Sequence, residues 1–121
     1  MGARILVVED NALNMQLVRD ILEFHGHSVD EATSVEEGAL KFKMTPPDLV
    51  LLDIQIPGGG GESLLRRIRE DPAGARLPVI AVTASAMQGD KERLLAAGFD
   101  GYMSKPIDTR EFSTVIARLL K

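Results

Sequence analysis

Three short runs of consecutive apolar residues divide the chain and predict its buried strands. They are 5–8 (Ile-Leu-Val-Val), 49–52 (Leu-Val-Leu-Leu) and 79–82 (Val-Ile-Ala-Val). Each run is unbroken and partly β-branched, as expected of a strand that is covered on both faces of a parallel sheet. Two shorter, more polar segments, 28–32 and 100–104, are predicted to be strands nearer the sheet edges.

Apolar residues recur at helical spacing between and after these runs. One face of the first predicted helix carries four of them: Leu13, Leu17, Ile21 and Leu22. The last predicted helix carries five: Phe112, Val115, Ile116, Leu119 and Leu120. Ser34 and Asp108 each precede a glutamate by three residues, which is a signal for the start of a helix.

The pattern amounts to five strand-then-helix units without a linker or a remainder. Such alternation produces right-handed crossovers around a parallel sheet, so we predict a doubly wound α/β fold with a five-stranded parallel sheet. The 121 residues, 45% of them hydrophobic, fit one compact domain over residues 1–121.

Charge and composition exclude several classes of function. A net charge of −4 and a pI near 5.1 disfavour nucleic-acid binding, which needs clustered basic residues. The apolar runs are too short to span a bilayer, so no membrane association is expected. The chain has no cysteine and no signal peptide, which favours a cytoplasmic location.

Polar residues gather where the predicted strands end. Glu9 and Asp10 follow the first strand, Asp53 closes the third, Thr83 closes the fourth and Lys105 follows the fifth. Each alone is explained as a helix cap, a strand residue or a solvated loop residue. Together they would meet beyond the carboxyl ends of the strands, where open α/β sheets bind ligands.

This set of side chains predicts a chemistry. Three carboxylates packed together repel one another unless a cation lies among them, and a few hard oxygen ligands with room for water suit one Mg²⁺ ion. Asp53 ends the most apolar central strand and is the best nucleophile, since carboxylates accept phosphoryl groups as acyl phosphates. Mg²⁺, the Thr83 hydroxyl and the Lys105 ammonium would neutralise the transferred charge.

Four motifs in this order resemble those of response-regulator receiver domains over the whole chain. They are 8–11 (Val-Glu-Asp-Asn), 51–57 (Leu-Leu-Asp-Ile-Gln-Ile-Pro) with Gly61, 82–84 (Val-Thr-Ala) and 104–106 (Ser-Lys-Pro). The resemblance implies the CheY-like (βα)₅ fold with strand order 2-1-3-4-5. Segments 9–15 and 89–93 are most similar to stand-alone regulators of the DivK type, and also resemble receivers fused to hybrid histidine kinases.

The resemblance implies a role for each site residue. Asp53 would be phosphorylated, and Thr83 and Lys105 would contact the phosphoryl group. Lys105–Pro106 would be a cis peptide bond, and Tyr102 would change rotamer with the state of Asp53. Four residues would hold the Mg²⁺ ion, one of them through water and one through its backbone carbonyl: Glu9 (water), Asp10, Asp53 and Gln55 (carbonyl).

The chain also departs from the family pattern. The four glycines 58–61 exceed the single Gly61 that the pattern asks for, and we expect this loop to be unusually mobile. Gln55 and Ser85 occupy positions that vary in the family and tune dephosphorylation. His25 and His27 lie in a predicted turn at the opposite pole, and we interpret them as surface residues because further metal ligands are lacking.

The leading functional hypothesis is a signalling module rather than an enzyme. It would take a phosphoryl group from a histidine kinase or phosphotransfer protein and would contact a downstream protein through its fourth and fifth strand-helix units, as a monomer or weak dimer. A receiver excised from a hybrid kinase stays open. A haloacid-dehalogenase-like phosphatase would want an aspartate at Gln55, and the acidic pair Glu9-Asp10 would repel the phosphate of a flavodoxin-like FMN.

Overall fold

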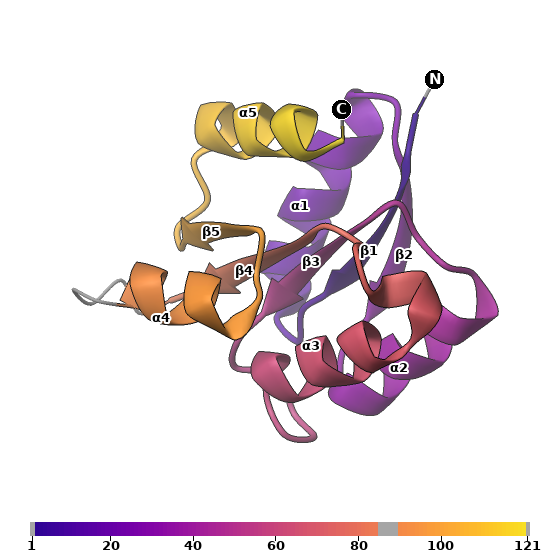
Figure 1. The fold of residues 1–121 in the computed structure, drawn as a ribbon. Helices are drawn as coiled ribbons and strands as arrows, with labels where there is room; N and C mark the ends of the chain where they lie inside the picture. Colours follow the sequence, from indigo (N-terminus) through magenta and orange to yellow (C-terminus); the bar gives the residue numbers. More distant parts are fainter. Residues whose placement is uncertain (1, 85–89, 121) are drawn as a thin grey trace.

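A computed structural model describes residues 2–84 and 90–120 and contains one five-stranded sheet. All strand pairs in it are parallel, and the strand order is β2-β1-β3-β4-β5, so the predicted fold class and order are confirmed (Figure 1). The elements in chain order are β1 (Arg4–Val8), α1 (Ala12–Phe24), β2 (Ser28–Ala32), α2 (Val35–Met44), β3 (Leu49–Asp53), α3 (Gly61–Glu70), the 3₁₀ turn η1 (Pro72–Gly74), β4 (Val79–Thr83), α4 (Asp90–Ala97), β5 (Gly101–Ser104) and α5 (Thr109–Leu119).

The central strands are buried on both faces, as their unbroken apolar sequence predicts. Every residue of β3 and of β4 is buried, and the two more polar segments form the edge strands β2 and β5. Alternate strand side chains enter two separate cores. One core lies under α1 and α5, and the other lies under α2, α3 and α4 on the opposite face (Figure 1).

The buried face of α1 agrees with the predicted one only in part, because Leu22 is buried and Ile21 packs against the core, but the other two predicted residues are not. Leu13 and Leu17 are 79% and 40% exposed, whereas Met15, Val18 and Leu22 are buried. The two faces compete because both have apolar residues three or four positions apart, and the helix packs its Met15, Val18 and Leu22 stripe on the sheet. Phe112 and Ile116 of α5 are buried as predicted.

Side-chain caps fix where the helices begin. The Asn11 side chain accepts a hydrogen bond from the Asn14 N–H at 3.0 Å, and the Ser34 hydroxyl accepts one from the Glu37 N–H at 3.2 Å. Asp108 caps α5 through two N–H groups. These caps satisfy backbone donors that a helix cannot pair internally.

Sheet register brings the carboxyl ends of the strands level. Val8 pairs with Leu52, Asp53 with Val82, and Thr83 with Ser104. The residues that follow β1, β3, β4 and β5 therefore emerge at one edge of the sheet. Within the described ranges, no helix combines the length and apolar character that a membrane crossing would need.

Candidate functional site

Buried polar side chains mark the carboxyl edge of the sheet. The polar or charged residues that are buried in the described part of the chain are Glu9, Asp53 and Thr83, with exposed fractions of 4%, 4% and 5%. Burying a polar group is costly unless it is paired, so such burial points to a built site. All three residues lie at the ends of neighbouring strands, as the sequence predicts.

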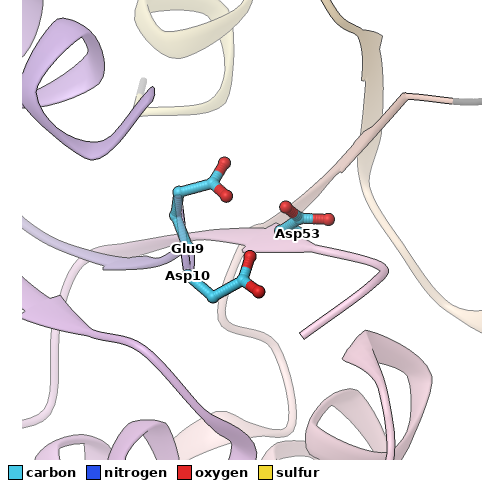
Figure 2. Close-up of side chains that lie close together, drawn as sticks. All are labelled: Glu9, Asp10 and Asp53. Carbon is cyan, nitrogen blue, oxygen red and sulfur yellow. The ribbon is translucent and has the colours of Figure 1, made fainter. Parts of the chain in front are cut away.

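Three carboxylates converge at this edge. One ligand oxygen from each of Glu9, Asp10 and Asp53 lies within 4.8 Å of the others. Figure 2 shows the carboxylates around a common space, with Glu9 and Asp10 reaching from the end of β1 toward Asp53. Asp10 is exposed whereas Glu9 and Asp53 are buried, so the cluster opens to solvent on the Asp10 side.

Lys105 joins the two buried carboxylates. Its Nζ lies 2.7 Å from Asp53 Oδ2 and 3.0 Å from Glu9 Oε1, and the lysine side chain is only 17% exposed. Lys105 reaches this position because its backbone N–H donates to the Thr83 carbonyl at 2.8 Å, which extends the β4–β5 pairing by one residue. The peptide bond between Lys105 and Pro106 is cis.

Backbone donors also hold one oxygen of each buried carboxylate. The Gln55 N–H donates to Asp53 Oδ1 at 2.9 Å, and the Asn11 N–H donates to Glu9 Oε2 at 3.1 Å. Both carboxylate oxygens of Asp53 thus accept a hydrogen bond, one from the Gln55 amide and the other from the Lys105 ammonium. The hydrogen bond from the Asn11 N–H to Glu9 was not predicted from the sequence, although an asparagine directly after an acidic pair is a signal for a helix cap.

Burial and pairing shift the pKa values of these groups in different directions. Burial raises the pKa of Glu9, and the neighbouring Asp53 carboxyl raises it further against the opposing effect of Lys105. Burial also acts to raise the pKa of Asp53, but the interaction with the neighbouring Glu9 carboxyl and the hydrogen bonds from Lys105 and the Gln55 amide outweigh it and lower that pKa. Burial acts to lower the pKa of Lys105, yet its two carboxylate partners raise it overall.

The charges of this cluster fit a divalent cation. Three carboxylates face one ammonium, which leaves an excess of two negative charges in a largely buried space. A hard divalent ion would remove the excess, and oxygen donors are the ligands that Mg²⁺ prefers. The residues present therefore fit the predicted metal.

Two further predicted residues lie at the same edge. Thr83 ends β4 and is buried, and Tyr102 lies on the adjacent strand β5, partly buried against the core under α2, α3 and α4. Ser85, which the sequence also singled out, falls outside the described residues. His25 and His27 lie beyond the end of α1, away from this edge, as predicted.

Comparisons with known proteins agree with this geometry. The response regulator receiver domain family matches residues 5–117. The polar-differentiation response regulator DivK of Brucella ovis is 39% identical over 120 residues, which cover 99% of this chain and 98% of the relative.

Solved structures give the same result. The receiver domain of a sensor histidine kinase from Pseudomonas aeruginosa, solved with a magnesium ion coordinated in its active-site cleft, is 33% identical with a TM-score of 0.90, and the match covers 99% of this chain and 98% of that one. A CheY-like receiver domain protein from Methanospirillum hungatei is 31% identical with a TM-score of 0.86, covering 99% and 94% of the two chains. The chain belongs to the family of response-regulator receiver domains of two-component signalling systems.

Proposed function

We propose that Asp53 accepts a phosphoryl group in a reaction that depends on Mg²⁺, and that the resulting aspartyl phosphate changes the contacts of the protein. One observation carries the proposal. The Asp53 carboxylate is buried at the end of a central strand, is paired at 2.7 Å with Lys105, and faces two further carboxylates, so that one ammonium serves a cluster of three.

Glu9, Asp10, Asp53 and the backbone carbonyl of Gln55 would hold one Mg²⁺ ion, with Glu9 acting through water. When bound, the ion neutralises charge on the oxygens of the transferred phosphoryl group. The magnesium ion in the Pseudomonas aeruginosa receiver supports this assignment by similarity.

The transfer itself asks for positioning and charge neutralisation. A carboxylate oxygen of Asp53 forms a bond to phosphorus, while the bond from phosphorus to the donor nitrogen of a phosphohistidine breaks. The imidazole leaves with the electron pair and takes a proton from solvent. Lys105 already lies beside the acceptor oxygen, and its ammonium, together with the Thr83 hydroxyl, would pair with the new phosphoryl oxygens.

The protein so described is a signalling domain that catalyses only its own phosphorylation and dephosphorylation. We propose a cytoplasmic, stand-alone domain spanning residues 1–121, monomeric or weakly dimeric. Its phosphodonor would be a histidine kinase or phosphotransfer protein, and its downstream partner would bind the β4-α4-β5-α5 surface. The 39% identity to DivK supports the stand-alone form, whereas the similarity to receivers of histidine kinases keeps a hybrid kinase as the second candidate.

Acetyl phosphate tests the acceptor without a kinase. We expect intact-mass spectrometry to show one added phosphoryl group in the presence of Mg²⁺, and none after EDTA treatment or in Asp53→Asn. Asp48→Asn is the matched control, because Asp48 lies at the opposite edge of the sheet, where its side chain accepts the Arg4 N–H. Undiminished labelling of Asp53→Asn would refute the assignment.

A further inference from the structure

The loop between β3 and α3 contains a glycine tract, residues 58–60, with an unusual backbone. Its three φ angles are +98°, +124° and +83° in succession. Gly60, with φ of 83° and ψ of 165°, lies in a region of backbone conformation that is essentially restricted to glycine. These angles describe a backbone path that only glycines follow without strain, whereas the mobility expected from the sequence stays a prediction.

The glycine tract ends in a turn that is hydrogen-bonded to the Asp53 carboxylate through one peptide group. The Gly61 N–H donates to the Ile54 carbonyl at 2.8 Å, and the N–H of the same peptide group, that of Gln55, donates to Asp53 Oδ1 at 2.9 Å. One peptide plane therefore connects the end of the glycine tract with the Asp53 carboxylate. The Ile54 N–H donates to the Val82 carbonyl at 3.0 Å, which fixes the start of the turn on β4.

Side chains in this segment would press on two consecutive peptide groups of the turn. A Cβ atom at position 60 would lie 3.3 Å from the Ile54 carbonyl oxygen, and one at position 61 would lie 2.7 Å from the Asp53 carbonyl oxygen. The other end of the tract is tied to α2, because the Val35 N–H donates to the Pro57 carbonyl at 3.0 Å. The turn is thus anchored on both sides of the glycines.

We infer that the Gly58–Gly60 tract is a positioning element, which fixes the orientation of the Ile54–Gln55 peptide group. In this orientation the N–H of the peptide group donates to Asp53, and its carbonyl accepts from the Gly61 N–H. The inference rests on the proposed function of Asp53 for its biological meaning. It deepens that proposal, since the Gln55 carbonyl proposed as a metal ligand belongs to the next peptide group of the same turn.

Amide hydrogen exchange in the metal-free protein tests the inference without phosphodonor or Mg²⁺. In the wild type we expect the Gln55 and Gly61 amides to be protected. In Gly60→Ala their exchange should accelerate about tenfold or more, because the alanine cannot follow the backbone path. Gly26→Ala is the matched control: Gly26 has a φ of +87°, its Cβ would meet no atom within 4 Å, and it lies in the α1–β2 turn.

Magnesium affinity is the second readout. Gly60→Ala should weaken Mg²⁺ binding about tenfold, as expected when support behind a ligand is lost, whereas Gly26→Ala should lower the melting temperature and leave the affinity unchanged. If Gly60→Ala does not fold, Gly59→Ala replaces it, since its Cβ would meet only the Ser63 hydroxyl at 3.2 Å.

The results separate the two proposals. Unprotected Gln55 and Gly61 amides in the wild type, or equal exchange in Gly60→Ala and Gly26→Ala, would overturn the positioning role whatever the metal does. Failure of wild-type protein to accept a phosphoryl group would instead count against the proposed function, and the exchange data would still decide the role of the tract.

Discussion

Asp10 is the exposed member of the acidic cluster, and it adds a third negative charge beside Glu9 and Asp53. Folding brings these charges together at a cost that only a cation removes. Asp10→Asn should therefore raise the free energy of unfolding in EDTA by about 1 kcal/mol and weaken Mg²⁺ binding, as is common when a functional site is neutralised.

Thermal unfolding and metal titration measure both effects. Asp20→Asn is the control, because it removes one negative charge from an exposed position on α1. Equal behaviour of the two variants in EDTA, or unchanged Mg²⁺ affinity in Asp10→Asn, would show that Asp10 is not a ligand.

His27 makes the stability of the fold depend on pH. Its Nδ1 accepts a hydrogen bond from the Ala3 N–H at 3.0 Å, and burial, followed by the nearby His25, lowers the pKa of His27. The unfolded state therefore binds the proton more readily. The stability from neutral His27 is fully present above the ordinary pKa of 6.5 and is lost as the pH falls through the lower folded pKa.

Replacing His27 with asparagine tests this dependence, because the amide oxygen can accept the same hydrogen bond but does not titrate. Between pH 7.5 and pH 5, chemical unfolding should show wild type losing more stability than His27→Asn. Parallel stability curves for the two proteins would contradict the account.

Among the secondary-structure elements, the bounds of the strands were predicted almost to the residue, whereas the buried face of α1 was predicted only in part. In a chain whose predicted strands and helices alternate, an unbroken apolar run such as 79–82 indicates a strand that is buried on both faces. In α1 two apolar stripes compete, and the sequence does not say which stripe meets the sheet. The carboxyl-end rule for α/β sheets located Glu9, Asp53 and Lys105, since it depends only on strand direction.

Other parts of the site could not be predicted from local sequence. The Gln55 N–H that directs Asp53 depends on three successive positive φ angles, and glycines alone permit such angles without requiring them. The Lys105 pairing with Glu9 joins residues at opposite ends of the chain. Both features arise from the tertiary structure.

Arg69 of α3 connects its own helix with the segment that leads into β4 and with the turn between α4 and β5. Its guanidinium donates to the Gly74 and Leu77 carbonyls at 2.9 and 2.5 Å and to the Gly98 carbonyl at 2.9 Å. It also pairs with Asp100 at 2.8 Å. The arginine thereby anchors the C-terminal end of α4 and the entry to β4 on α3.

A lysine cannot reproduce this planar set of donors, so Arg69→Lys should lower the free energy of unfolding by about 2 kcal/mol. Urea denaturation measures the change. Arg66→Lys, at an exposed position of the same helix, serves as the control. A loss in Arg69→Lys no larger than that of the control would show that the anchor contributes little.

At the scale of the whole molecule, the proposed switch links Asp53 to the β4-α4-β5-α5 surface through Thr83, which ends β4, and Tyr102, which lies on the adjacent strand β5. A Thr83 hydroxyl drawn to a new anion would vacate space that Tyr102 can enter, since charge-assisted hydrogen bonds are short and strong. Beryllofluoride, which mimics the phosphoryl group, should bias an existing two-state equilibrium by about 1 to 3 kcal/mol, or about 5- to 150-fold in partner affinity.

Amide NMR of wild type and Thr83→Ala follows this coupling. We expect beryllofluoride to shift resonances around Tyr102 and α4 in the wild type and to leave them nearly unchanged in Thr83→Ala, which should still bind the mimic. Shifts of equal size in the variant would remove Thr83 from the mechanism without affecting the acceptor.

The central claim is that Asp53 is the phosphoacceptor, and locating the phosphoryl group tests it most directly. Borohydride reduces an acyl phosphate of aspartate to homoserine, so peptide mass spectrometry of reduced, phosphorylated protein identifies the modified position. We predict homoserine at position 53, dependent on Mg²⁺ during phosphorylation. Reduction at Asp10 or Glu9 in place of Asp53, or an unmodified Asp53 in a protein that carries the phosphoryl mass, would contradict it.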